Sequence, residues 1–310
     1  MKLINKLSEF IGKDLIKNNL SIYLDASKKN NKTFEHCLFY GLPGTGKTTL
    51  AKIIANELNH KIRIVQGSSI QRPLDVINLL LTTNSDDILF IDEIHAINKG
   101  LFELFYSAME EGYVDLNIGR DFNAKITRIK LPNFTLIGAT TSLGMIPRAL
   151  EDRFGIVFCL DEYTDKEIFD IIKMYSDKMK LHLNEEEISP LVAAAKGIPR
   201  VGYKLVRRVY DFRTMDQHIK VSEILKNIGF IYKEFDNNDL IYLKALDAQE
   251  NPIGIKTLSQ ITSIDEQTIM LKIEPYLLKK KLINKTQSGR VITKEGFIIL
   301  RQLENLKEDL

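Results

Sequence analysis

Residues 41–49 read GLPGTGKTT, which matches the phosphate-loop pattern G-x-x-x-x-G-K-[ST] with Gly41, Gly46, Lys47 and Thr48 in the fixed positions. Glycine permits backbone angles that a Cβ would forbid, so successive N–H groups can turn inward around phosphate oxygens. The lysine of such a loop reaches the β- and γ-phosphates, and the threonine hydroxyl ligates Mg²⁺. The stretch therefore predicts a site for a nucleoside triphosphate and its magnesium ion.

The residues on either side of this loop are those that a phosphate site needs. Before it, HCLFY (36–40) is a short apolar run typical of a buried strand, and after it TLAKIIANEL (49–58) has helical periodicity. A strand that leads through a glycine loop into a helix aims the unpaired N–H groups of the helix N-terminus at an anion. This context favours a phosphate site over a glycine turn that carries a lysine by chance.

The first half of the chain alternates between strand and helix patterns. Short apolar runs that indicate buried strands lie at 37–40, 61–65, 87–92, 134–139 and 156–160. Such alternation is typical of a parallel sheet with helices on both faces. An α/β domain is therefore expected over residues 1–163.

Two smaller domains are expected after residue 163. Helical patterns at 164–179, 185–195 and 199–214, without strands between them, predict a small helical domain over 164–234. Further helical patterns near 237–248, 255–264 and 265–281 lead into two short strands within 282–293. A hairpin after helices is typical of a winged helix-turn-helix, which we expect over 235–310.

Bulk composition restricts the function classes only weakly. The chain has 310 residues, 44% of them apolar, and a net charge of +2, so a nucleic-acid contact would have to be local. Its two cysteines, Cys37 and Cys159, lie in apolar runs and are expected to be buried, reduced thiols. The five histidines have no metal-ligand spacing, and no apolar run approaches the length of a membrane span. These features predict a cytoplasmic protein without a membrane partner.

A second acidic motif follows another apolar run. ILFIDEIH (88–95) places Asp92 and Glu93 at the carboxyl end of a strand, where ligands bind to parallel sheets. Asp92 would hold Mg²⁺, and Glu93 would orient and deprotonate the attacking water. The alternative for Asp92 and Glu93 is that they only cap the following helix. In GATT (138–141), Thr140 or Thr141 could contact the γ-phosphate or the water, although turn chemistry explains them equally well.

Two arginines stand beside these motifs. Arg153 lies in ALEDRFG (149–155) and Arg200 lies near the start of a predicted helix. A guanidinium suits a developing phosphate charge, but each arginine alone is more typical of a surface ion pair. The segment 112–131 predicts a two-stranded ribbon, either packed at an edge or projecting.

The ordered motifs resemble those of AAA+ ATPases and, more narrowly, of the RuvB family, whose members drive branch migration of Holliday junctions. The resemblance runs from EFIG (9–12) to GRVIT (289–293) and is carried by GLPGTGKTTLA, LFIDEIH, LFYSAMEEGYVD, FTLIGATT, LEDRFG, GIPR and EPYLL. It implies an ATPase domain with a parallel sheet, a helical lid domain and a C-terminal winged-helix domain.

The resemblance also implies roles for individual residues. Asp92 and Glu93 would form the Walker B pair, and Thr48 with Asp92 would hold Mg²⁺. Either Thr140 or Thr141 would be sensor 1. The loop residues that would contact ATP are Gly41, Gly44, Thr45, Gly46, Lys47, Thr48 and Thr49.

Further parts of the nucleotide site are implied in the same way. Arg153 would be a finger that reaches the site of the neighbouring subunit, and Arg200 would be sensor 2. The adenine would lie near Phe10, Ile11 and Tyr163, and the site would also include Glu110, Glu111 and Gly112.

The partners implied are a homo-oligomeric ring, expected to be a hexamer, and duplex DNA or four-way junctions. Hairpin 112–131 would dock onto RuvA, and a RuvC-type resolvase could join. The cations Lys279, Lys280, Lys281, Lys285 and Arg290 surround the predicted wing and would meet phosphates, or else form a solvated face. One arginine of the family's wing is replaced near Gln287-Ser288.

Two alternatives stay open. A clamp-loader-like AAA+ subunit would share the nucleotide motifs, but the ribbon at 112–131 and the wing argue against it. A scaffold that binds ATP without hydrolysing it would not need Lys47, Asp92, Glu93 and Arg153 together.

Overall fold

The computed structural model describes residues 4–118, 125–249 and 251–308, and the chain divides into two compact units between Tyr163 and Thr164. Unit 1 contains the predicted α/β domain. Unit 2 contains both the helical stretch and the C-terminal module.

Unit 1 is built on a five-stranded parallel sheet, as predicted. The strand order is β2-β3-β6-β1-β7, so that β6 lies between β1 and β3. All the neighbouring pairs are parallel, and the carboxyl ends of the strands therefore meet at one edge. The strands are β1 (Cys37–Gly41), β2 (Ile62–Gln66), β3 (Ile88–Asp92), β6 (Thr135–Thr140) and β7 (Ile156–Leu160).

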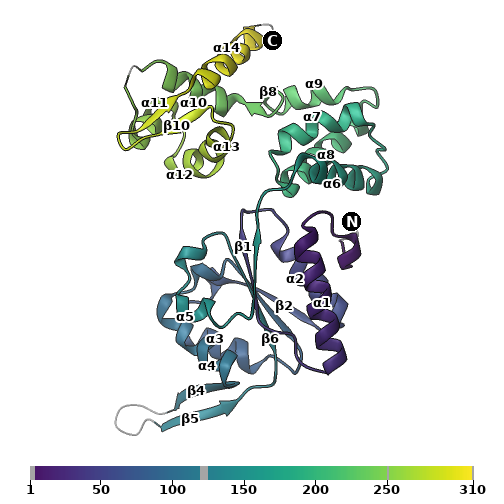
Figure 1. Ribbon diagram of the computed structural model, residues 1–310, viewed down its shortest axis with the longest axis vertical. Coiled ribbons are helices and arrows are strands. Elements are labelled where there is room, and N and C mark those ends of the chain that lie inside the picture. The colour runs from purple at the N-terminus through teal and green to yellow at the C-terminus, as the bar shows by residue number, and fades with distance from the viewer. Residues whose placement is uncertain (1–3, 119–124, 250, 309–310) are drawn as a thin grey trace. The chain divides into compact units, whose positions relative to one another are not determined.

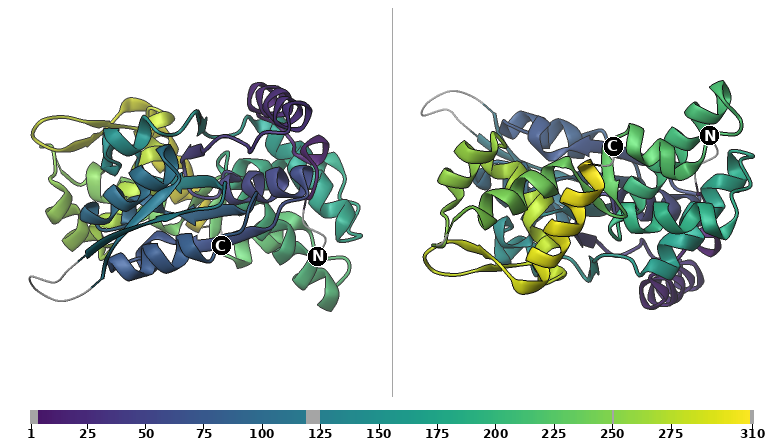
Figure 2. Two further views of the ribbon diagram at one scale, coloured as in Figure 1. Left: turned by 90° about the horizontal axis from the view of Figure 1, so that it is seen from below. Right: turned by 90° about the horizontal axis from the view of Figure 1, so that it is seen from above.

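Helices cover both faces of this sheet (Figure 1). On one face lie α1 (Asp14–Asn30) and α2 (Lys47–Leu58), and on the other α3 (Pro73–Leu81) and α4 (Phe102–Glu110). Alternate strand residues pack into the core on one face of the sheet or the other, because successive side chains of a strand point to opposite faces. Leu38, for example, packs with the α3 and α4 side. Figure 2 shows unit 1 from two further directions.

Short helical turns connect these elements. The helix α5 (Arg148–Glu151) precedes β7. Single 3₁₀ turns lie at Leu7–Glu9, Gly67–Ser69, Ile94–Ala96, Lys99–Leu101 and Leu143–Met145.

The predicted ribbon is an antiparallel hairpin of β4 (Tyr113–Ile118) and β5 (Lys125–Lys130). Val114 at its base is buried in the core beside α4, and Asp115 pairs with Arg128 across the two strands at 2.8 Å. The strands extend away from the sheet (Figures 1 and 2). The tip of the predicted segment 112–131 lies outside the described residues.

One expectation about the cysteines is wrong. Cys37 is buried on β1, but Cys159 is exposed on β7. Strand β7 lies at the edge of the sheet, and its neighbour on the same face, Val157, is also exposed. An apolar run at an edge is covered on one face only, so periodicity alone overstated its burial.

Unit 2 begins with the predicted helical stretch. Thr164 caps α6, and its capping box with Glu167 is present as predicted. The helices are α6 (Asp165–Lys178), α7 (Glu185–Ala195), α8 (Pro199–Met215) and α9 (Val221–Asn227), followed by the short strands β8 (Phe230–Tyr232) and β9 (Phe235–Asp236).

The C-terminal module has the helices and hairpin of a winged helix. The predicted helix near 265–281 is interrupted by a π-helical turn at Ile269–Ile273. The elements are α10 (Asn237–Asp247), α11 (Ile255–Thr262), α12 (Glu266–Thr268), α13 (Glu274–Lys279), β10 (Ile283–Lys285), β11 (Arg290–Ile292) and α14 (Lys294–Glu308).

An ion pair ties this module to the helical stretch inside unit 2. Lys196, after α7, donates to the buried carboxylate of Asp239 at 2.8 Å and lies 4.7 Å from the ring centre of Tyr276. Because breaking a buried pair leaves an uncompensated charge, this contact resists separation of the two parts. Within the described residues, none of the helices is both long and apolar enough to cross a membrane.

Candidate functional site

The sheet brings the predicted motifs to one edge. The phosphate loop follows β1, the Asp92-Glu93 pair ends β3, and the two threonines end β6. Neighbouring strands lie about 4.8 Å apart, so the loop and the acidic pair are roughly 10 Å apart with the threonines between them. An ATP γ-phosphate and its attacking water fit into that span.

The backbone of the phosphate loop has the conformation that its glycines were expected to allow. Gly41 has φ +131°, and a Cβ there would lie 2.2 Å from the carbonyl oxygen of Leu160. Gly44 and Gly46 also have positive φ, at +83° and +108°. Larger residues at these positions would close the cradle of N–H groups that an anion requires.

Lys47 is fixed at the centre of this loop. It is buried on the first turn of α2, and its ammonium donates to the carbonyl oxygens of Gly41 and Leu42, each at 2.8 Å. Thr45 donates to the same Leu42 oxygen at 2.8 Å. The loop is therefore ordered by its own side chains, with a positive charge inside it.

The donors predicted for a metal suit magnesium. Thr48 supplies a hydroxyl on the first turn of α2, and Asp92 supplies a carboxylate at the end of β3. Magnesium prefers such oxygen ligands and is usually bound by one or two of them together with phosphate oxygens. The residues present therefore fit the ion that the motif implies.

Glu93 is held in place by a threonine. It has a left-handed backbone, φ +49°, which is uncommon for a residue with a Cβ. Its Oε2 accepts from the backbone N–H of Thr141 at 3.1 Å and from the Thr141 hydroxyl at 3.0 Å. The side chain is 37% exposed, so one side stays open to solvent.

The two threonines of GATT have different surroundings, which the sequence could not separate. Thr140 is fully buried, and its hydroxyl lies 2.9 Å from Nδ1 of His95 and accepts from the N–H of Ser142. His95 Nδ1 also lies 3.2 Å from Glu93 Oε2. Sequence reasoning missed His95; its place two residues after Glu93 was the available signal.

Aromatic side chains flank the other end of the phosphate loop. Phe10 and Tyr163 are both buried, and the Tyr163 hydroxyl donates to the carbonyl oxygen of Thr45 at 2.9 Å. A Cβ on Gly46 would lie 3.1 Å from the Phe10 ring. Ile11, half-buried, follows Phe10. The structure therefore brings these predicted base-contact residues to the start of α2.

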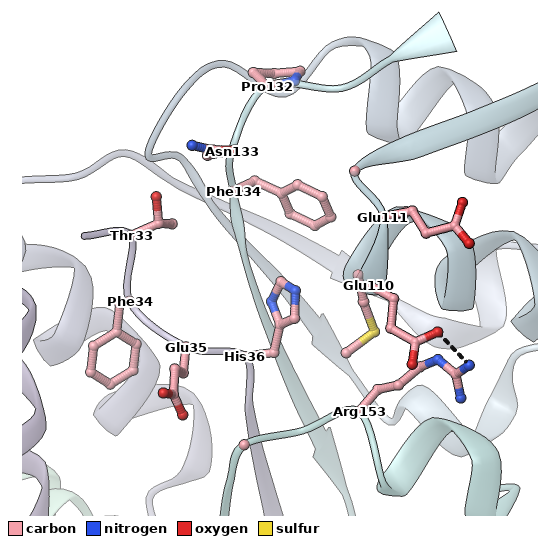
Figure 3. A pocket seen from close by; sticks show the side chains of 14 residues that line it. Thr33, Phe34, Glu35, His36, Glu110, Glu111, Pro132, Asn133, Phe134 and Arg153 are labelled. Carbon is pink, nitrogen blue, oxygen red and sulfur yellow. Dashed lines mark hydrogen bonds and ion pairs between the residues drawn. The ribbon is translucent and has the colours of Figure 1, made fainter. Parts of the chain in front are cut away.

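Arg153 lies at the opposite edge of the sheet (Figure 3). It lines a pocket with the segments that enter β1, β6 and β7 at their amino ends, residues 33–36, 132–134 and 155. Strand β1 separates this edge from the phosphate loop by five residues, or about 16 Å. Glu110, Glu111 and Gly112 line the same pocket. These four residues therefore do not reach the phosphate loop of their own chain, and their place in a nucleotide site shared with a neighbouring subunit stays a prediction.

A half-buried histidine also lines the pocket. His36 Nδ1 accepts from the backbone N–H of Leu136 at 2.8 Å. Burial lowers the pKa of His36 below its usual value, against a smaller opposing effect of its hydrogen bond to the Met109 backbone. Neutral His36 thus fixes the start of β6 beside Arg153.

The predicted DNA contacts divide into two groups. Lys280 and Lys285 are about half exposed on the C-terminal module. Lys279 and Lys281 are exposed beside them.

Arg200 is exposed at the start of α8 in unit 2, and its role in nucleotide binding stays a prediction.

Arg290 does not belong to the exposed group, and its expected phosphate contact is wrong for this conformation. It is buried, and its Nε and Nη2 donate to the Glu274 carboxylate at 2.7 and 3.2 Å. Tyr242 donates to the same carboxylate at 3.0 Å. Arg290 is the first residue of β11, directly after the turn, and an arginine at such a position can point into the core. Its charge alone does not reveal the direction of the side chain.

Comparison with known proteins extends these observations. The model of the Holliday junction DNA helicase RuvB P-loop domain matches residues 4–160, the RuvB AAA lid domain matches 163–230, and the RuvB C-terminal winged helix domain matches 233–301. These matches follow one another along almost the whole chain.

Individual relatives agree with the family models. The chain is 48% identical to the Holliday junction branch migration complex subunit RuvB of Ureaplasma parvum, over 97% of this chain and 96% of that protein. It is 43% identical to the subunit of the same name from Mycoplasma genitalium, over 94% and 95%. The solved Thermotoga maritima RuvB Holliday junction branch migration motor aligns with a TM-score of 0.82 and 33% identity, covering 96% of this chain and 97% of that one.

Proposed function

Because the chain belongs to the RuvB family of AAA+ ATPases, we propose that it is the motor subunit of a Holliday junction branch migration complex. It hydrolyses ATP and uses the energy to move duplex DNA through the junction. The observation that carries this proposal is the split of the ATPase residues between two edges of one sheet. Lys47 and Glu93 lie at one edge and Arg153 at the other.

Each residue at the carboxyl edge has a task in phosphoryl transfer. The loop N–H groups and Lys47 bind and orient the phosphates, since positioning and charge neutralisation supply most of the catalysis. Glu93 accepts a proton from the attacking water, and Thr141 holds its carboxylate on one side. Thr48 and Asp92 would hold Mg²⁺, which neutralises phosphate charge when bound.

Arg153 completes the site of a neighbouring copy. It lies about 16 Å from its own phosphate loop, so it cannot reach nucleotide there. In a closed ring each subunit would present this edge to the loop of the next, because head-to-tail contacts repeat the same pair of surfaces. A hexamer is the ring that we propose. Glu110, Glu111 and Gly112 would then contact nucleotide across the interface together with Arg153.

Unit 2 transmits the change to DNA. Arg200 would sense the γ-phosphate from the start of α8, and the Lys196–Asp239 pair would carry the movement of the helical part into the C-terminal module. Exposed lysines near the hairpin of that module would meet the phosphate backbone without reading the sequence. The three-domain division at 163 and 234 belongs to this proposal.

The projecting hairpin β4–β5 is proposed as the docking site for RuvA, which would supply junction specificity. A hairpin with little core of its own gains stability by packing on a partner. A RuvC-type resolvase could then act on the same junction, in the cytoplasm.

The experiment uses a synthetic four-way junction with labelled arms. We expect conversion to duplex products that requires ATP, Mg²⁺ and RuvA, and no conversion with the Glu93→Gln variant, which should still bind ATP. Conversion by Glu93→Gln at the rate of the unmodified protein would contradict the proposal, as would a complete failure of the unmodified protein with RuvA present.

A further inference from the structure

Lys13 lies where the N-terminal segment turns into the first helix of unit 1. Gly12 and Lys13 are both in the left-handed region, with φ of +75° and +54°. Such angles are uncommon for a residue with a Cβ and persist where other contacts hold them. The turn separates Phe10, which is buried against the phosphate loop, from α1.

The ammonium group of Lys13 contacts three consecutive residues at the end of unit 1. It pairs with the carboxylate of Asp161 and donates to the carbonyl oxygen of Glu162 at 2.7 Å. It also lies 4.6 Å from the ring centre of Tyr163, within the range of a cation–π contact. The Lys13 side chain is only 10% exposed, whereas that of Asp161 is 75% exposed.

These contacts fasten two segments that are about 150 residues apart in the sequence. Tyr163 is bonded to the phosphate loop through Thr45, and the ring of Phe10 lies beside Gly46. Two aromatic rings next to a phosphate cradle form the surface on which a nucleotide base would stack. Lys13 contacts the ring of Tyr163, whose hydroxyl is bonded to the loop.

We propose that Lys13 is a positioning residue for the adenine base. It clasps the segment that carries Phe10 and Ile11 to the segment that ends in Tyr163, and so keeps the base pocket closed around the nucleotide. The inference rests on the proposed ATP site. It adds a residue that the phosphate-loop and Walker B motifs do not include.

The test separates base binding from phosphate binding. Fluorescent ADP is titrated into the full-length protein, and inorganic tripolyphosphate, which has no base, is measured as a competitor. Lys13→Met should weaken ADP binding on the order of tenfold, since it removes a charge-assisted contact that is largely buried. Its affinity for tripolyphosphate should be unchanged, the KM for ATP should rise, and kcat at saturating ATP should stay the same.

Three further variants serve as controls. Lys13→Arg keeps the charge and should retain most of the ADP affinity. Lys17→Met removes a lysine of the adjoining helix α1, which pairs with Asp14 at 2.8 Å, and should leave ADP binding unchanged. Asp161→Asn alters an exposed partner, should fold normally, and should give a smaller loss of ADP affinity than Lys13→Met.

Equal losses for ADP and tripolyphosphate would overturn the inference, because Lys13 would then act on the whole loop. Unchanged ADP binding in both Lys13→Met and Asp161→Asn would overturn it as well. Neither result would affect the proposed motor function, which depends on the junction assay and on Glu93.

Discussion

The Arg153 guanidinium donates to the Glu110 carboxylate at 2.7 Å, at the end of α4. It also lies 4.6 Å from the ring centre of Tyr106 and donates to the carbonyl oxygen of Ala149. Its Nε is buried without a hydrogen-bond partner among the described residues. Arg153, the proposed finger for a neighbouring site, is thus paired on its own subunit with a carboxylate that would compete with phosphate.

Glu110→Gln should therefore release the finger. The pair is partly exposed and contributes about 1 kcal/mol or less, so kcat for ATP should rise by up to roughly fivefold. Steady-state hydrolysis at saturating ATP measures this. The matched control is Glu103→Gln, at an exposed carboxylate in the first turn of the same helix, which should leave kcat unchanged. A fall in kcat comparable to that of Arg153→Ala would show that Glu110 supports the finger instead of restraining it.

Thr141→Val should slow hydrolysis without affecting nucleotide binding. The substitution removes the hydroxyl that holds Glu93 at 3.0 Å but leaves the backbone N–H bond. A misplaced general base should lower kcat on the order of 10- to 100-fold. Thr141→Ser should restore most of the rate.

Thr140→Val should instead lower the free energy of unfolding by about 1–3 kcal/mol, because it leaves buried hydrogen-bond partners unsatisfied. The reverse pattern would assign the Glu93 contact to Thr140.

Substitution of Arg290 should affect the stability of the protein more than its binding to DNA. Arg290→Met leaves the Glu274 carboxylate buried without its cation, which should destabilise unit 2 by about 3–5 kcal/mol. Thermal denaturation of the full chain measures the loss. Arg301→Met, which removes an exposed ion pair with Glu304, should change stability by about 1 kcal/mol or less. Equal effects of the two variants would contradict the structural role of Arg290.

Lys285→Gln should weaken DNA binding without changing the stability of the protein. Its side chain is exposed, so melting should be unchanged while affinity for duplex DNA falls equally for all sequences. The slope of log affinity against log salt should decrease by about one unit for one lost phosphate contact. An unchanged slope would remove Lys285 from the DNA surface.

Acid should destabilise unit 1 through His36. Burial lowers the pKa of His36 in the folded chain, whereas the unfolded residue has a pKa of about 6.5. Below that pH the unfolded chain binds more protons, so the stability present at neutral pH is lost as pH falls toward the folded pKa. Melting temperatures between pH 8 and about 5 should fall more steeply for the unmodified protein than for His36→Gln. His182→Gln, at an exposed histidine, should keep the original slope.

Much of the fold followed from the sequence because its signals were local. The phosphate loop, the strands around it and the capping box at Thr164 depend on nearby residues, and the structure has all of them. The direction of Arg290 and the exposure of Cys159 depend on tertiary packing, which periodicity does not contain. The same holds for Thr141, whose partner Glu93 lies 48 residues away.

Lys13 is a residue that sequence motifs could not identify. Its neighbours in the sequence gave no reason to select it, because its partners come from the far end of unit 1. Sequence motifs describe the groups that touch phosphate and metal. The side chains that hold those groups in place become visible only when distant segments are brought together.

The central claim, that each ATP site is shared between two subunits, can be tested by mixing two inactive variants. Lys47→Ala lacks a working phosphate loop but keeps Arg153, and Arg153→Ala lacks the finger but keeps the loop. In equimolar mixed rings, about a quarter of the interfaces should combine an intact loop with an intact finger. We predict that ATP hydrolysis, absent from each variant alone, returns on mixing to about that fraction. Mixtures as inactive as their components, under conditions where mixed rings form, would contradict the shared site.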